Sequence, residues 1–256
     1  MPSEAARRCP APAGRLRAVF DVFKRPAVRL EVPRLKPRRA ADQALRVNLA
    51  ELTPELVPYL GQAAYIQLSI FEALARALML APTVNAKEVL SPASGFALDK
   101  HERLIAELRR LVDDPAVVMA PFAPAIDSYA AVVRGADWYE SLTSVYITAG
   151  ILDDFFILLA AGIDGDVGPR AARIVDSETG REVIETLLSD AIAEDSTLGS
   201  RLALWGRRLV GDTLLVARSA IHHSGNVRTD EQRIEPVFTE LIAKHSRRMD
   251  GLGLTA

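Results

Sequence analysis

Two short windows of the sequence carry charged side chains at a spacing that could do chemistry. Lys100 follows Ala97 by three residues, and Arg181 follows Glu178 by the same interval. Both windows lie in segments whose apolar residues recur at helical spacing, and positions three apart on a helix share one face. A glutamate followed at this distance by a histidine is how helical bundles bind paired iron ions, but neither window contains a histidine. The windows therefore predict a polar cavity without a bound metal or cofactor.

A small set of charges can be assembled around these windows. If Lys100, Arg181, Glu178 and Asp154 all face inward, two positive and two negative charges meet between the helices. Buried charges must be paired, because an isolated one costs several kcal/mol. Two interpretations stay open. The charges form a structural salt-bridge cluster, or Lys100 and Arg181 bind an anionic or carbonyl-bearing ligand. In the second case Glu178 or Asp154 is the general acid or base, and Gln67 orients the ligand.

Helices must position these residues, because apolar side chains recur at helical spacing from about residue 53 onward. No strand-like alternation of useful length is present. The sequence predicts an all-α fold built on four long helices, with additional helices packed around them. Pro92, beside Ser91, predicts a kink or restart near the beginning of the second helix. The expected helices, the four long ones and the additional ones together, cover about residues 53–81, 86–111, 137–161, 169–193, 195–221 and 230–249.

Local signals mark where several helices begin and end. Asp114 followed by Pro115 is a good N-cap and first-turn pair for a short connecting helix. Asp137 and Glu140 have the spacing of a capping box at the start of the third long helix. Gly225 is placed to end the fifth. These signals predict helix ends that do not depend on distant residues.

The first 48 residues differ from the rest of the chain. Arginine, lysine and proline are frequent there, and prolines forbid a long helix. We therefore divide the chain into an Arg/Pro-rich extension, residues 1–48, and a helical domain, residues 49–256. The extension is either a solvated segment or a basic arm that contacts RNA or another acidic partner.

Composition restricts the compartment and the partners. The net charge is −2, so no global charge directs the chain to nucleic acid or to an anionic membrane. Cys9 is the only cysteine, which excludes an intramolecular disulfide and favours a reducing cytoplasm. We expect no secretory signal and no apolar run near the roughly 18 residues that a membrane span needs.

Several segments resemble one known family. Residues 59–68 and 80–83 look like the first helix and turn of ferritin-like tRNA hydroxylases, the MiaE-like proteins, and the similarity covers residue 50 to the end. The resemblance implies a ferritin-like four-helix bundle. The better-known members are di-iron monooxygenases that hydroxylate an isopentenyl-type modification on a tRNA adenosine. The similarity continues in residues 119–122, Asp137-Trp138, Tyr146, residues 202–209 and residues 244–249.

The resemblance also assigns positions to the iron ligands. Carried across, the six ligands fall on Gln67, Ala97, Lys100, Ala149, Glu178 and Arg181. Only one is a carboxylate and none is a histidine. A shift of one residue would bring in His101, but its partner three residues earlier would then be Leu98. Within the matching segments, Tyr65 and Tyr146 join Gln67 as candidate substrate-binding residues.

Three functions follow from these residues. The first is a metal-independent enzyme that uses the bundle cavity on a small organic substrate, in specialised metabolism. Polar side chains at the former ligand positions favour it, because apolar filling of an unused cavity would cost less. The second is a non-enzymatic bundle that binds RNA, protein or a second copy of itself. The third keeps tRNA hydroxylation and requires iron.

Overall fold

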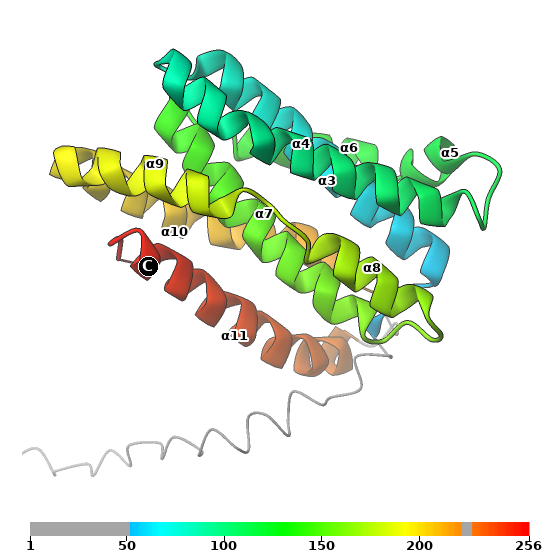
Figure 1. The fold of residues 1–256 in the computed structure, drawn as a ribbon. Helices are drawn as coiled ribbons and strands as arrows, with labels where there is room; N and C mark the ends of the chain where they lie inside the picture. The colour runs from blue at the N-terminus through cyan, green and yellow to red at the C-terminus, as the bar shows by residue number, and fades with distance from the viewer. Residues whose placement is uncertain (1–51, 222–226, 256) are drawn as a thin grey trace, which may run out of the picture. The chain divides into compact units, whose positions relative to one another are not determined.

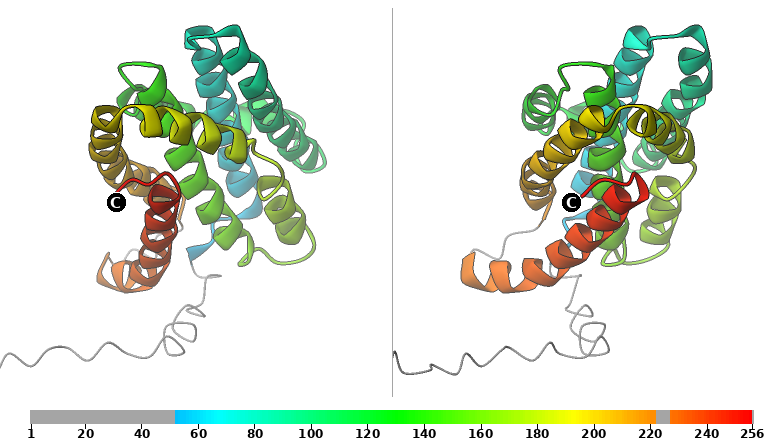
Figure 2. Two further views of the ribbon diagram at one scale, coloured as in Figure 1. Left: turned by 60° about the vertical axis from the view of Figure 1, so that its left-hand side comes forward. Right: turned by 90° about the vertical axis from the view of Figure 1, so that its left-hand side faces the viewer.

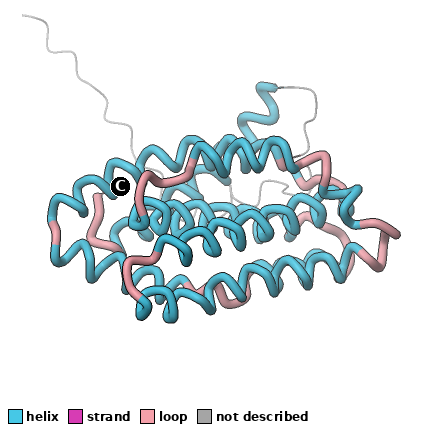
Figure 3. Tube along the Cα trace, turned by 90° about the horizontal axis from the view of Figure 1, so that it is seen from above, coloured by secondary structure: helices cyan, strands magenta, loops and turns pink. Residues whose placement is uncertain are grey.

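The computed structural model describes residues 52–221 and 227–255, and every regular element in these two ranges is an α-helix (Figures 1 and 3). This confirms the predicted all-α class. The extension at residues 1–48, the domain boundary after it and Gly225 lie outside the described residues. The helices are α3 (Leu56–Leu80), α4 (Val84–Leu108), α5 (Pro115–Met119), α6 (Ala123–Val132), α7 (Trp138–Ala160), α8 (Val167–Val175), α9 (Arg181–Glu194), α10 (Ser196–Ser219) and α11 (Val227–Gly251).

Helix α7 is the central element of the described region. It packs against α3, α8, α9, α10 and α11, whereas α3 and α4 form a closely packed hairpin. Helices α8 and α9 both contact α4 as well as α7, so together they fill the place of a fourth bundle helix. In Figure 2, α10 and α11 lie on the opposite side of α7 from α3 and α4. The bundle core is therefore bounded by α3, α4, α7 and the α8–α9 pair.

The central position of α7 explains its composition. A helix surrounded by other helices is apolar on all faces. Both α3 and α7 contain an 18-residue stretch that is long and apolar enough to cross a membrane by length and composition alone. The expectation that no such run exists was therefore wrong. In α7, 67% of that stretch is buried inside the protein, as in the core helix of a bundle, so these helices are weak evidence for a membrane span.

The predicted helix starts are confirmed at atomic detail. Asp114 accepts a hydrogen bond from the backbone of Ala116, with proline in the first turn of α5. Asp137 accepts from the backbone of Glu140 at 2.9 Å. The Glu140 carboxylate in turn accepts from the backbone of Ala136, one residue before the usual position in a capping box. Each cap satisfies backbone donors that the first turn leaves unpaired.

Helix α4 continues through Pro92 rather than restarting there. Proline has no backbone N–H, so the carbonyl of Glu88 loses its regular helical partner. The hydroxyl of Ser91 donates to that carbonyl at 3.0 Å and to the carbonyl of Lys87 at 2.9 Å. This side chain replaces the missing backbone bond and lets the helix continue.

The fourth long helix is broken, and the predicted continuous helix at residues 169–193 was wrong. Helix α8 ends at Val175 and α9 begins at Arg181. Gly180, just before α9, has a φ of +68°, and a Cβ atom there would lie 2.6 Å from the Cβ of Ala93 on α4. Only glycine accommodates both the left-handed backbone and this close approach. Residues 176–180 therefore form a loop that packs against α4 at Gly180.

Candidate functional site

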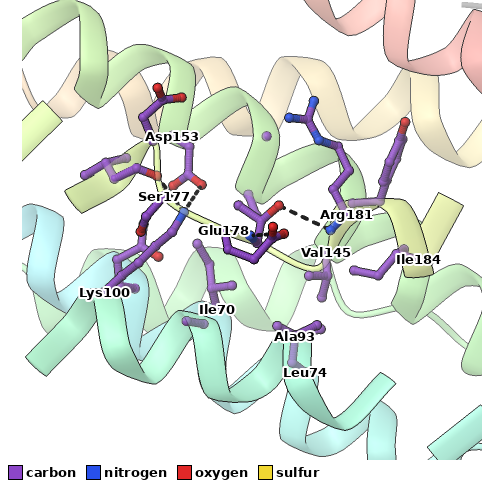
Figure 4. Close-up of a pocket in the computed structure, with 18 of the residues that line it drawn as sticks. Ile70, Leu74, Ala93, Lys100, Val145, Asp153, Ser177, Glu178, Arg181 and Ile184 are labelled. Atoms are coloured by element: carbon purple, nitrogen blue, oxygen red, sulfur yellow. Dashed lines mark hydrogen bonds and ion pairs between the residues drawn. The ribbon is translucent and has the colours of Figure 1, made fainter. Parts of the chain in front are cut away.

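A cavity of about 290 Å³ lies between α3, α4, α7, α11 and the loop that joins α8 to α9 (Figure 4). The structure brings all six positions assigned to the former iron ligands to its wall. Two of them are alanines, whose small side chains leave space where a glutamate would project. The six are Gln67, Ala97, Lys100, Ala149, Glu178 and Arg181.

Lys100 forms a buried ion pair that the sequence did not predict. Its ammonium donates to Asp153 on α7 at 3.1 Å and to the carbonyl of Val175 at 2.5 Å. The Lys100 side chain is 2% exposed and that of Asp153 is 13% exposed. The amide of Gln67 donates to the other carboxylate oxygen of Asp153 at 2.7 Å. Lys100 therefore pairs with Asp153, and neither Glu178 nor Asp154 is its partner.

Asp153 has a buried carboxyl group with a shifted pKa. Burial raises the pKa of its carboxyl group above the ordinary value, because a carboxylate loses hydration there. The ammonium of Lys100 and the amide of Gln67 act in the opposite direction and lower the same pKa. Burial has the larger effect, so the pKa is raised and the carboxylate is a stronger base than that of an ordinary aspartate.

Asp154 belongs to a second ion-paired group on the α11 side. It accepts from the guanidinium of Arg248 and, at 3.1 Å, from the ammonium of Lys244. Arg248 also donates to the carbonyl of Gly150 at 2.9 Å. A Cβ atom at Gly150 would lie 2.5 Å from Nε of Arg248, so glycine is needed for the guanidinium to reach this carbonyl. The carboxylate of Asp154 is thus directed away from Lys100 and toward α11.

Glu178 and Arg181 occupy the loop side of the cavity, and both are exposed. The carboxylate of Glu178 accepts from the backbone N–H groups of Thr179 and Gly180, each at 2.9 Å. These bonds, that of Gly180 first, lower the pKa of Glu178. The guanidinium of Arg181 has no hydrogen-bond or ion-pair partner within the described part of the chain. The predicted four-charge cluster is therefore wrong, because its members belong to separate groups.

The two candidate tyrosines have different positions. Tyr146 lines the cavity, and its hydroxyl donates to the carbonyl of Arg248 at 3.4 Å. Burial raises its pKa to about 12. Tyr65 lies outside the cavity, and its hydroxyl donates to Asp127 at 2.8 Å. The expectation that Tyr65 contacts a ligand in this cavity was therefore wrong, whereas binding by Tyr146 stays a prediction.

The position of His101 supports the register used for the six positions. Its Nδ1 atom lies 2.9 Å from the carbonyl oxygen of Ala64, so the ring packs between α4 and α3. Its ring therefore faces α3 instead of the cavity. His245 on α11 is buried, and burial lowers its pKa to about 4. Neither histidine lines the cavity.

Sequence reasoning missed Asp153 and Arg248. One signal for Asp153 was present: it follows Ala149 by four residues, so both occupy one face of a helix, whereas Asp154 is turned by about 100° from it. Asp153 is thus the acidic residue on the ligand face. Arg248 had no such signal, because its role depends on how α11 packs against α7.

Comparison with known protein families identifies the domain. The sequence model of a family described as "Ferritin-like domain, actinomycetes" matches residues 51–227. No curated protein matches the chain. The matched range includes every bundle helix from α3 to α10 and all six cavity positions. The closer resemblance to tRNA hydroxylases stays a prediction.

The donor set does not fit the di-iron centre that this resemblance implies. Such a centre takes four carboxylates and two histidines from the four bundle helices. Within residues 52–221 and 227–255, no three His, Cys, Asp or Glu side chains are grouped so that they could hold a metal ion. The two carboxylates on the α7 wall, Asp153 and Asp154, are already bonded to protein cations. The buried ammonium of Lys100 would repel an iron ion at the same place.

Proposed function

Because this chain belongs to the family of actinomycete ferritin-like domains, we propose that it uses the cavity of a ferritin-like bundle as a metal-independent enzyme that moves a proton on a small organic substrate. One observation carries the proposal: the buried ion pair of Lys100 and Asp153 lines an open cavity. An ion pair that only stabilised the bundle would not need a cavity beside it, and close packing would exclude one. The pair therefore faces space that a ligand can occupy.

The size of the cavity limits the substrate. Its volume of about 290 Å³ is at the lower end of the roughly 300–1,000 Å³ found for ligand pockets. One water molecule takes about 30 Å³ in the liquid, so the cavity has room for about ten atoms of that size. A small metabolite fits this space.

The reaction that these groups support is proton transfer beside a carbonyl group. Asp153 removes a proton from the carbon next to the carbonyl, and the C–H electron pair moves to the carbonyl oxygen. The ammonium of Lys100 donates a hydrogen bond to that oxygen as its negative charge develops. Gln67 holds the carboxylate of Asp153 in place through its amide. Return of the proton from Asp153 to carbon completes the cycle, so all protons and electrons are conserved.

Deuterium exchange tests this proposal without knowledge of the natural substrate. The full-length protein is incubated in D₂O with a panel of small 2-oxo acids, ketones and aldehydes, and loss of C–H signal is followed by proton NMR. We expect exchange with at least one compound. Asp153→Asn and Lys100→Met should lower its rate by about 100-fold or more, as expected for loss of general acid–base catalysis.

A matched variant controls for general effects of the substitution. Lys87 is an exposed lysine on α4, the same helix that carries Lys100. Lys87→Met should therefore leave the exchange rate unchanged. Exchange that is equally fast in Lys100→Met, or no exchange with any compound, would contradict the proposal. Two iron ions bound per chain after expression in iron-supplemented medium would also contradict the proposal.

A non-enzymatic bundle is the second candidate, because the acidic groups of the α7 wall are all ion-paired. Asp154 already has two cationic partners, Arg248 and Lys244, as expected of a structural group. Under this alternative Lys100→Met changes only stability. The exchange assay and the unfolding experiment described below then give different answers for the two candidates.

A further inference from the structure

Arg248 has more hydrogen-bonding capacity than the protein uses. The residue is 9% exposed and lines the cavity. Its Nη2 atom donates to Asp154 and to the carbonyl of Gly150. Its Nε and Nη1 atoms are buried and have no partner within the described residues. Buried N–H donors nearly always have an acceptor, so these two point to an acceptor that the described protein atoms do not supply.

A second cation with free donors, Arg181, also lines the cavity. Arg181 is the first residue of α9, and its guanidinium also lines the cavity without a partner among the described side chains. Figure 4 shows Arg181 at one end of the cavity and Lys100 with Asp153 at the other. The positive charges of Arg181 and Arg248 both act on the hydroxyl of Tyr146 and oppose the effects of burial and Glu185 on its pKa. Arg181 and Arg248 therefore both belong to the cavity wall that includes Tyr146.

We propose that Arg248 and Arg181 bind the carboxylate of a small monoanionic substrate. Two of the three N–H groups of Lys100 already donate to Asp153 and to the carbonyl of Val175, which leaves one for the carbonyl oxygen of the substrate. The carboxylate-binding role that the sequence suggested for Lys100 therefore passes to Arg248. A guanidinium presents N–H donors in a planar fork that matches a carboxylate. The proposal rests on the proposed function in one respect: with the carboxylate bound by the two arginines, the rest of the substrate occupies the part of the cavity that Lys100 and Asp153 line.

The charges around the cavity favour a single negative charge on the ligand. Asp154 already balances part of the charge of Arg248, which leaves less than two full positive charges for the ligand. Asp176, Glu178 and Glu182 are exposed at the mouth of the cavity and would repel a multiply charged anion. Sulfate and phosphate are therefore disfavoured, and a carboxylate with a short uncharged remainder is preferred.

Calorimetric titration of the full-length protein tests the charge and shape of the ligand. The probes are acetate, propanoate and 2-oxobutanoate, with propanamide as a neutral isostere and sulfate as a dianion. We expect the carboxylates to bind, propanamide not to bind, and sulfate to bind more weakly than any carboxylate. Equal binding of propanamide, tighter binding of sulfate, or no carboxylate binding would overturn the proposal.

Substitutions then locate the site. Arg181→Gln is expected to fold normally because the side chain is exposed, and it should weaken carboxylate binding by about tenfold or more, as for loss of a charge-assisted hydrogen bond. Arg248→Gln should weaken binding at least as much, although it also removes a partner of Asp154 and can affect folding. Arg109→Gln changes an exposed arginine at the end of α4 and serves as the control. Unchanged binding in Arg181→Gln would overturn the assignment.

Failure of this inference is distinguishable from failure of the proposed function. Lys100→Met should retain carboxylate binding while it loses deuterium exchange. If carboxylates bind through the two arginines but no exchange occurs, the inference stands and the enzymatic proposal fails. If only neutral carbonyl compounds exchange and no carboxylate binds, the enzymatic proposal stands and the inference fails.

Discussion

Removal of Lys100 should destabilise the protein strongly, because it leaves a buried carboxylate without its cation. The Lys100 nitrogen and the Asp153 oxygen are 3.1 Å apart. At an effective dielectric constant of about 20, two unit charges at this distance attract each other by about 5 kcal/mol. Loss of one partner of a buried pair typically costs about 3–5 kcal/mol. We therefore expect Lys100→Met to lower the free energy of unfolding by about 3–5 kcal/mol.

A double-mutant cycle separates the ion pair from other effects of the substitutions. Urea unfolding at pH 7, followed by circular dichroism, is measured for Lys100→Met, Asp153→Asn and the double variant. Asparagine keeps an acceptor for the amide of Gln67 while it removes the charge. We expect the double variant to lose about 2–3 kcal/mol less free energy of unfolding than the sum of the losses in the two single variants. This difference is within the range for directly contacting residues. The exposed Lys87→Met should change stability by less than about 0.5 kcal/mol.

The destabilisation caused by Lys100→Met should depend on pH. Burial raises the pKa of Asp153 above its ordinary value of 3.8, and Lys100 opposes this rise. Without Lys100 the pKa should rise further, so the folded state binds a proton that the unfolded state has lost. The stabilisation that this bound proton gives the folded state is fully present below pH 3.8 and is lost as pH rises through the folded-state pKa of Asp153. Lys100→Met should therefore be more destabilised at pH 8 than at pH 5. A cost below about 1 kcal/mol at pH 7, or a double variant equal to the sum, would refute the reasoning.

Two further predictions concern residues outside the ion pair. Burial lowers the pKa of His245 from 6.5 to about 4. Between those pH values the unfolded state binds one more proton than the folded state, so the free energy of unfolding falls as pH falls. In urea unfolding, His245→Gln should remove about 2 kcal/mol of the stability that the protein loses between pH 7 and pH 5. Equal pH dependence in both proteins would contradict this. Gly180→Ala should cost about 2 kcal/mol or more in thermal unfolding, because alanine is strained at a φ of +68° and its Cβ would lie 2.6 Å from that of Ala93. Gly211→Ala is the control: its Cβ would meet no heavy atom within 4 Å, so it should be stabilising by up to about 1 kcal/mol, and a similar loss in both variants would argue against strain at Gly180.

The helices could be predicted because their signals are local. Asp137 caps its helix through the backbone of Glu140, three residues away, and Asp114 does so through the backbone of Ala116, two residues away. The apolar repeat of α7 was visible for the same reason, although its surroundings were not. The sequence therefore located α7 as a helix, but only its contacts with five other helices distinguish a bundle core from a membrane span.

The break between α8 and α9 could not be predicted from neighbouring residues. The segment keeps helical periodicity on both sides of the loop, so the pattern alone favours one helix. The carbonyl of Val175, at the end of α8, accepts from Lys100 on α4, 75 residues away. Gly180 passes against Ala93, also on α4. These partners belong to another helix, and only the folded bundle brings them together.

The sequence by itself determined the all-α class and the helix caps, because each depends on periodicity or on residues a few positions apart. The six positions that meet at one cavity followed from the resemblance to a known family. The tertiary structure alone decided which charges pair. Lys100 and Asp153 are 53 residues apart, and Arg248 and Asp154 are 94 residues apart. Adjacent aspartates on α7 point about 100° apart, so their partners depend on which helix packs against each face. That packing leaves the guanidinium of Arg181, and two nitrogen atoms of the guanidinium of Arg248, without partners among the described residues, and with them the proposed site for a carboxylate.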